Sequence, residues 1–298
     1  MTLLCLGEAL VDLICERELE APSDADAFIP HPGGALANVA VAASRAGCES
    51  AVLGGVGQDF WGRWLRARLE EEGVGTNWMA SVEGASTPLA IVVFDRHREP
   101  AFQIYGEGIR ALMEAGGGLL SDALKNAGAL VFGSNTLVDA PERELTMRAR
   151  AEAAERSLPI LFDPNLRPNR WIEMDKAVAL CRDLCDGATV VKASREEAEL
   201  MTGRAESATA AESICELGAR IAVVTNGARG AVMRGEAEGQ VAAPPVDVVA
   251  PLGAGDAFIG AFAAGLAARD WDLSGASDAL PAAARAGARA CTGWGAQS

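Results

Sequence analysis

Short apolar runs alternate with helix-period segments along most of the 298 residues, and this alternation constrains the fold more than any other feature. Runs such as 2–6, 129–132 and 220–224 are typical of strands that are buried on both faces. Segments such as 37–46, 141–156 and 208–217 have helical periodicity. Strands that alternate with crossover helices predict an α/β fold, with a mostly parallel sheet covered by helices on both sides.

Two segments interrupt the alternation. Residues 13–31 form short apolar pieces broken by polar residues and by Pro22 and Pro30. Residues 76–108 contain alternating stretches on either side of the charged sequence DRHRE at 95–99, which predicts a hairpin. No internal repeat or low-complexity linker divides the chain. We therefore expect a single domain over residues 1–298, with segments of about 13–31 and 76–108 forming a small β lid beside the sheet.

The composition excludes several classes of protein. A formal net charge of −15 repels nucleic acid and anionic membranes, so a small molecule is the expected partner. The three lysines are Lys125, Lys176 and Lys192, and none precedes Ser or Thr, so a Walker A loop is absent. With only two histidines, a multi-histidine metal site is excluded.

Cysteine content and the apolar segments predict the compartment. Seven cysteines, an odd number, are scattered through apolar runs, as expected of reduced core thiols in a cytosolic protein. The first apolar run lacks a basic flank and contains Glu8 and Asp12, unlike a signal peptide. The apolar stretch 257–268 is shorter than the ~20 residues of a membrane helix. The sequence therefore predicts a soluble, cytoplasmic protein.

The sequence PLGAGDAF at 251–258 is the strongest motif. Gly253, Ala254 and Gly255 leave the backbone N–H groups bare just before a helix, which creates an anion hole suited to a phosphoryl group. Asp256 would then accept a proton from an attacking hydroxyl while the anion hole neutralises the phosphoryl charge. The alternative is that Asp256 merely caps the helix. Phe258 stands where a dinucleotide-binding fingerprint needs its third glycine.

This motif resembles the DTxGAGD-type motif of the ribokinase (PfkB-type) family of small-molecule kinases. The family's other signature, a glycine pair shortly before an asparagine, is matched by Gly33, Gly34 and Asn38, and similar motifs extend from residue 7 to residue 297. The resemblance implies a ribokinase-like three-layer α/β sandwich with a mostly parallel central sheet and a small β lid. It also implies ATP-dependent phosphorylation of a hydroxyl group, with Asp256 as the catalytic base.

The resemblance assigns further residues to the sugar. Asp12 corresponds to an aspartate that binds sugar hydroxyls, and carboxylate oxygens suit neighbouring hydroxyl donors. Gly33 and Gly34 would permit close backbone approach, and Asn38 would offer donors and an acceptor, with helix capping as its alternative role.

The sequence DPNLR at 163–167, followed by Trp171, resembles fructokinases and 2-keto-3-deoxygluconate kinases within the family. Arg167 would hold a phosphate or a sugar oxygen through its planar guanidinium group. The alternative is a structural ion pair between Arg167 and Asp163.

Other motifs resemble the family's nucleotide side. Ser194 and Glu197 occupy the place of an NxxE motif that organises Mg²⁺ and phosphate, so Glu197 is the metal candidate, acting through water. The alternative is a helix capping box. Thr225 and Gly227 match a turn beside the nucleotide phosphates, with a plain β-turn as the alternative. Residues 295–297 resemble the loop on the adenine and monovalent-cation side.

Some positions depart from the family pattern. Ala250 stands where potassium-activated members have a cation-ligating aspartate, so the resemblance does not imply potassium activation. Ala35 replaces the lysine of ribokinases, which weakens a ribose-specific function. We expect a fructokinase-like sugar kinase that uses ATP and Mg²⁺. A 2-keto-3-deoxygluconate kinase, a nucleoside kinase and a catalytically silent sugar- or nucleotide-binding regulator are the alternatives. Some members of the family form homodimers through the lid, so the resemblance implies a lid-mediated homodimer for this chain as an expectation.

Overall fold

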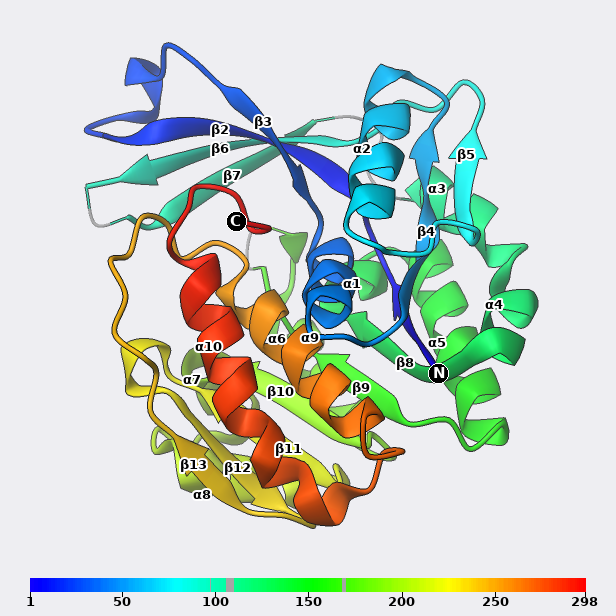
Figure 1. Ribbon diagram of the computed structural model, residues 1–298, viewed down its shortest axis with the longest axis vertical. Coiled ribbons are helices and arrows are strands. Elements are labelled where there is room, and N and C mark those ends of the chain that lie inside the picture. Colours follow the sequence, from blue (N-terminus) through cyan, green and yellow to red (C-terminus); the bar gives the residue numbers. More distant parts are fainter. Residues whose placement is uncertain (97, 106–109, 168–169) are drawn as a thin grey trace.

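The computed structural model describes residues 1–96, 98–105, 110–167 and 170–298, and its strands form two sheets (Figure 1). In the nine-stranded sheet, pairing is parallel from β11 across to β5 and antiparallel in the pairs β11–β12 and β12–β13. The predicted mostly parallel sheet is therefore confirmed. In spatial order its strands are β13 (Gly239–Val241), β12 (Ala231–Gly235), β11 (Ile221–Thr225), β10 (Val190–Ser194), β9 (Ile160–Asp163), β8 (Ala127–Gly133), β1 (Thr2–Leu6), β4 (Ser50–Gly57) and β5 (Met79–Val82).

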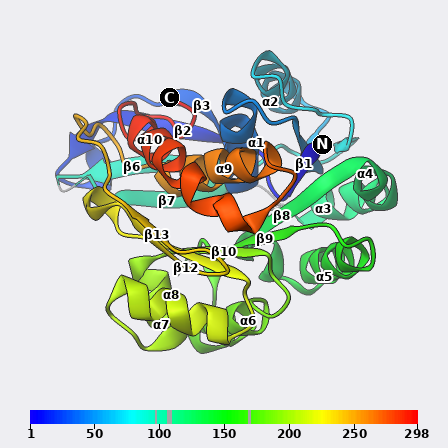
Figure 2. The same cartoon turned by 60° about the horizontal axis from the view of Figure 1, so that its bottom comes forward.

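Helices cover both faces of this sheet, as Figure 2 shows. On β1, Leu3 and Cys5 join the core beneath one helical layer, whereas Leu4 and Leu6 join the core on the opposite face. Successive side chains of a strand point to opposite faces, so a continuous apolar run serves two cores. One layer contains α1 (Ala35–Arg45), α9 (Ala254–Ala267) and α10 (Leu280–Ala290), and the other contains α4 (Leu120–Asn126), α5 (Ala140–Glu155), α6 (Met174–Asp183), α7 (Arg195–Thr202) and α8 (Ser207–Glu216).

The second sheet forms a lid of four strands in the order β3-β2-β6-β7. The expected hairpin is confirmed by the antiparallel pair β6–β7, although His97 of its turn lies outside the described residues. The strands are β2 (Leu10–Leu19), β3 (Ile29–Gly33), β6 (Leu89–Asp95) and β7 (Pro100–Tyr105).

The lid strands differ in two ways from the expected segments 13–31 and 76–108. Strand β2 begins three residues earlier than expected, because Leu10 and Val11 already pair with β3. Strand β5 belongs to the large sheet, since Met79 is buried in its core. Residues 106–108 of the second segment lie outside the described residues.

Several helix boundaries also differ from those expected. Helix α9 begins at Ala254, three residues before the expected start, because Gly253 adopts a left-handed conformation that starts the helix there. A 3₁₀ segment, Leu273–Ala279, precedes α10, where a single helix from residue 276 is expected. Two further helices, α2 (Phe60–Glu71) and α3 (Arg110–Gly117), flank the half of the sheet that contains β4.

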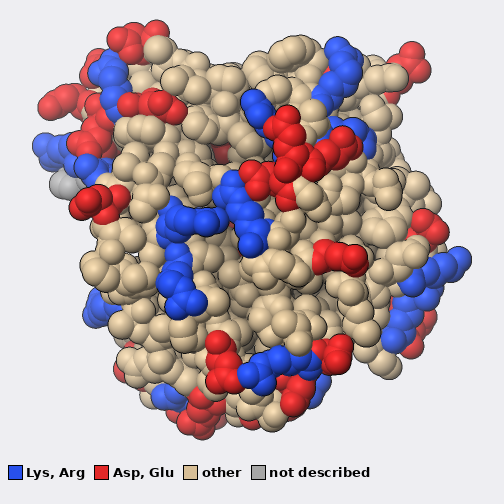
Figure 3. Space-filling model, viewed as in Figure 1, with Lys and Arg blue, Asp and Glu red and all other residues tan. Residues whose placement is uncertain are grey.

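Charge is unevenly distributed over the surface. Figure 3 shows basic side chains gathered near the centre of the face formed by α1, α9 and α10. A hollow of about 370 Å³ on this face is lined by Arg45, Arg285 and Arg289 together with several alanines. A net charge of −15 therefore coexists with a locally basic surface. None of the helices in the described residues is long and apolar enough to span a membrane.

The buried aromatic pair of β8 and β9 gives a test of this core. Phe132 is fully buried and its ring centroid lies 5.1 Å from that of Phe162. We expect Phe132→Ala to lower the free energy of unfolding in urea by about 3–5 kcal/mol, because it removes a large buried side chain and leaves a cavity. Ile172→Ala, at a fully exposed position, should change it by less than about 0.5 kcal/mol. Equal losses in both variants would contradict the described core.

Candidate active site

A cavity of about 70 Å³ lies between the lid, the beginning of α1 and the beginning of α9. Six of the residues singled out from the sequence line it: Asp12, Gly34, Asn38, Arg167, Gly253 and Asp256. They come from segments spread over the whole chain, so the fold brings the sugar-side candidates and the anion hole together.

Asp256 is the third residue of α9, which begins at Ala254. Gly253 is the N-cap residue, so capping by Asp256 is wrong. Instead, Asp256 Oδ2 accepts a hydrogen bond from Asn38 Nδ2 at 2.9 Å, and Oδ1 accepts one from Asn165 Nδ2 at 3.2 Å. The capping alternative for Asn38 is also wrong, because the N-cap residue of α1 is Gly34 and the Asn38 amide is bonded to Asp256. Two amides therefore hold both carboxylate oxygens of Asp256 as acceptors.

The surroundings of Asp256 suit a general base. The residue is only 6% exposed, and burial raises the pKa of its carboxyl group above the usual range. The hydrogen bond from Asn38 and the nearby charges of Arg167 and Lys192 act in the opposite direction and favour the ionised form. In its ionised form, a carboxylate with a raised pKa is a stronger proton acceptor than an exposed aspartate.

Three carboxylates face the sugar side of the cavity. A Cβ atom on Gly33 would lie 2.1 Å from Asp12 Oδ2, so only glycine fits beside this side chain. Burial, followed by the charge of Asp256, raises the pKa of Asp12 to about 7. Glu8 Oε1 accepts hydrogen bonds from Ala35 N at 3.1 Å and Asn135 Nδ2 at 2.9 Å. Carboxylates crowded in this way offer acceptors to a ligand that carries several hydroxyl donors.

Arg167 faces the cavity rather than Asp163. Its guanidinium group lies over the Phe102 ring of the lid, 5.8 Å from the ring centroid. Asp163 is paired with Lys192, so the alternative of an Arg167–Asp163 ion pair is wrong. The guanidinium group is therefore placed for a ligand and in contact with the lid.

Lys192 is a site residue that sequence reasoning missed. It is 5% exposed on β10, and its Nζ lies 3.0 and 3.2 Å from the two carboxylate oxygens of Asp163. A Cβ atom on Gly255 would lie 2.6 Å from Nζ, so the ammonium group is against the backbone of the anion hole. Asp163, Glu197 and Asp256 raise the pKa of Lys192, which stays charged. A lysine within an apolar strand was the signal that could have identified it, because a lysine is rarely buried without a charged partner.

The expected nucleotide-side residues lie at neighbouring strand ends. Ser194 and Thr225 are register partners on β10 and β11, and Gly227 follows with φ 49°. The capping box is confirmed: Glu197 N donates to Ser194 Oγ at 3.2 Å, and Ser194 N donates to Glu197 Oε2 at 2.8 Å. Among the described residues, the lining of the Asp256 cavity does not include Ser194, Glu197, Thr225 or Gly227.

The remaining oxygen of Glu197 bears on metal binding. Glu197 Oε1 accepts a hydrogen bond from Leu166 N at 2.7 Å, so backbone N–H groups engage both of its oxygens. Within the described ranges, no group of three or more His, Cys, Asp or Glu side chains is arranged to hold a metal ion. A contact from Glu197 to Mg²⁺ through water fits this geometry better than direct ligation.

Comparison with known proteins identifies the family. Residues 2–298 match the pfkB family carbohydrate kinase description. The chain belongs to this family of carbohydrate kinases and is an ATP-dependent phosphotransferase that acts on a sugar. It is 32% identical to the probable fructokinase-4 of Arabidopsis thaliana over 262 residues. This match covers 87% of this chain and 80% of the relative.

Solved structures agree with this assignment. A fructokinase double mutant from Vibrio cholerae, with fructose, ADP and potassium ion bound, has a TM-score of 0.85 at 30% identity, covering 100% of this chain and 94% of that one. Aminoimidazole riboside kinase from Salmonella enterica, complexed with aminoimidazole riboside and an ATP analog, has a TM-score of 0.83 at 27% identity, covering 100% and 96%. The expected ribokinase-like fold is therefore confirmed.

The raised pKa of Asp12 gives a stability test. A carboxyl group with a pKa of about 7 in the folded protein, against about 3.9 in an unfolded chain, binds more protons when folded. Its contribution therefore makes the protein less stable as the pH rises from about 4 to about 7, by at most about 1.4 kcal/mol per pH unit. We expect Asp12→Asn to remove this contribution. The thermal unfolding midpoint of the variant should therefore rise relative to that of the wild type as the pH is raised from about 4 to about 7. Asp247→Asn, at an exposed position, should leave the slope unchanged.

Proposed function

We propose that this carbohydrate kinase is fructokinase-like and transfers the γ-phosphoryl group of ATP to a primary hydroxyl of a small neutral sugar. The observation that carries the proposal is the position of Asp256, buried in the sugar-side cavity directly beside the N–H groups of residues 253–255. A proton acceptor and an anion hole side by side are what phosphoryl transfer to an alcohol requires. Fructokinases at about 30% identity support the same acceptor class.

In the proposed reaction, Asp12, Gly33, Gly34 and Asn38 hold the sugar hydroxyls and direct the primary hydroxyl toward Asp256. Asp256 accepts the hydroxyl proton as the oxygen attacks the γ-phosphorus. The backbone N–H groups of residues 253–255 stabilise the transferred charge, with Lys192 beneath them. The Arg167 guanidinium group packs against the Phe102 ring of the lid. Closing of the lid would therefore bring the charge of Arg167 to the transferred phosphoryl group.

ATP is proposed to lie along the strand ends marked by Ser194, Thr225 and Gly227. Mg²⁺ would enter with the nucleotide, held through water by Glu197, and would neutralise phosphate charge there. Ala250, which is fully buried in an apolar cluster with Leu10 and Ile14, has no side-chain oxygen to offer a cation, and potassium activation is not proposed. A single kinase domain, a cytoplasmic location and a lid-mediated homodimer stay predictions.

One observation favours a second acceptor class. Arg167 and Arg170 both line the cavity, and a guanidinium group would pair with the carboxylate of 2-keto-3-deoxygluconate. Glu8 and Asp256 line the same cavity and would repel that carboxylate, as would Asp12 in its ionised form. Because these carboxylates oppose the two guanidinium groups, we favour a neutral sugar.

An acceptor screen tests the proposal. We expect ADP release with fructose to exceed release with ribose, 2-keto-3-deoxygluconate and nucleosides, measured with a coupled assay in the presence of ATP and Mg²⁺. A preference for 2-keto-3-deoxygluconate would assign Arg167 and Arg170 to its carboxylate. Binding of ATP without turnover on any acceptor would instead indicate a silent regulator.

Replacement of the base tests the chemistry. We expect Asp256→Asn to lower kcat by at least ~100-fold, with smaller changes in the KM values, because the amide cannot take up the proton. Steady-state kinetics with the preferred acceptor measures this. Full activity of the variant would refute the assignment of Asp256 as the base.

A further inference from the structure

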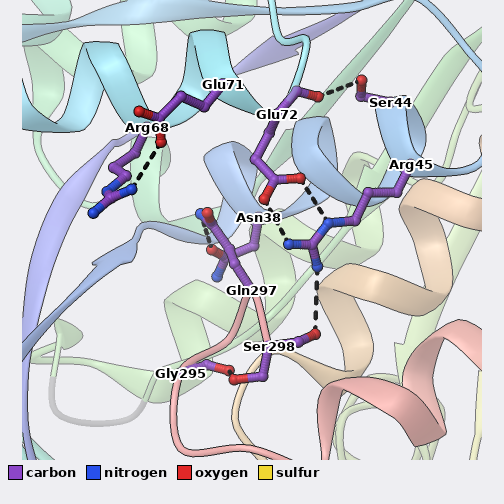
Figure 4. A network of polar contacts seen from close by, with 9 residues as sticks. All are labelled: Asn38, Ser44, Arg45, Arg68, Glu71, Glu72, Gly295, Gln297 and Ser298. Atoms are coloured by element: carbon purple, nitrogen blue, oxygen red, sulfur yellow. Dashed lines mark hydrogen bonds and ion pairs between the residues drawn. The ribbon is translucent and has the colours of Figure 1, made fainter.

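A chain of side-chain amides connects the last residues of the sequence to Asp256. Gln297 Nε2 donates a hydrogen bond to Asn38 Oδ1 at 2.9 Å (Figure 4). Asn38 Nδ2 in turn donates to Asp256 Oδ2 at 2.9 Å. Gln297 belongs to the loop at 295–297 that the sequence singles out, but the reaction described above gives it no role.

The direction of this chain is fixed by its end at Asp256. An ionised carboxylate only accepts hydrogen bonds, so Asn38 must present its NH₂ group to Asp256 and its carbonyl oxygen to Gln297. Gln297 in turn must present its NH₂ group to that carbonyl. If Asn38 turned by 180°, its carbonyl oxygen would face the Asp256 carboxylate, and its NH₂ group would face the Gln297 NH₂ group.

The Gln297 amide is held in place by the packing of its neighbours. Trp294 packs against Phe94 of the lid with ring centroids 5.4 Å apart. Ala296 is 5% exposed and fits against Gly253, where an added Cβ atom would lie 2.5 Å from the Ala296 Cβ. Arg45 Nη1 donates to the Ser298 carbonyl at 3.3 Å while the same guanidinium group makes two 2.7 Å hydrogen bonds to Glu72 (Figure 4).

We propose that Gln297 is a positioning residue, which orients the Asn38 amide so that it donates to Asp256 and keeps that carboxylate ready to accept the sugar proton. Gln297 is absent from the described lining of the Asp256 cavity, and it acts through Asn38. The inference rests on the proposed role of Asp256 as the base.

Two substitutions at position 297 separate orientation from simple loss of contact. Gln297→Met removes the donor and should lower kcat about threefold to tenfold, the range for one lost hydrogen bond. Gln297→Glu should lower kcat further, because its carboxylate offers Asn38 an acceptor and draws the NH₂ group away from Asp256. In both variants the acidic limb of the kcat–pH profile should move to higher pH, since Asp256 loses a donor that favours its ionised form. Gln58→Glu, at an exposed position, is the matched control and should leave kcat unchanged.

The deciding measurement is a double-mutant cycle. In an Asn38→Ala background, Gln297→Met should have no further effect on kcat, because the residue through which Gln297 acts is gone. If Gln297→Met lowered kcat equally in the wild-type and Asn38→Ala backgrounds, or left the acidic limb of the kcat–pH profile unmoved, the proposal would be overturned. An inactive Asp256→Asn enzyme would then still support the proposed base. A fully active Asp256→Asn enzyme would overturn the proposed base and this inference together. Thermal unfolding midpoints are measured for all variants, and Gln297→Met alone carries the test if Gln297→Glu does not fold.

Discussion

The hydrogen bond between Asn38 and Asp256 joins the beginnings of two helices, and the geometry of the site depends on it. Helices α1 and α9 can lie this close because Gly260 has no side chain: an added Cβ atom would come within 2.5 Å of the Val39 carbonyl oxygen. Because Gly253 is the N-cap residue of α9, Asp256 lies in the first turn of the helix and faces Asn38. The N–H groups of that first turn lie beside the carboxylate. A proton acceptor and an anion-binding backbone are thus held by one rigid helix pair.

Burying so many charges in one place requires compensation. Asp163 and Lys192 pair beneath the anion hole, and Arg167 is drawn over the cavity by the carboxylates and by the Phe102 ring. Asp12, which has no such close partner among the described hydrogen bonds and ion pairs, has its pKa raised to about 7. Burial therefore raises the pKa values of both aspartates of this cavity, and that of Asp12 lies near neutral pH.

Much of the fold was predictable from local patterns. The apolar run at 2–6 and the helical periodicity at 141–156 specify buried strands and covering helices, because burial on both faces leaves a readable signal in the sequence. The boundaries of α9 and β5 were harder to predict. The left-handed conformation of Gly253 and the burial of Met79 both depend on contacts with segments distant in the chain.

The sequence by itself determined the class of the site, because an anion hole is built from consecutive residues: glycines, a helix start and a carboxylate fit within 253–256. Which partners that carboxylate has was decided only by the tertiary structure. Asn165, Lys192 and Gln297 lie 41 to 91 residues away from Asp256 in sequence, and no local spacing reveals that they reach it or its surroundings. Hydrogen bonds of this kind depend on distances in space, and folding alone brings such distant segments together.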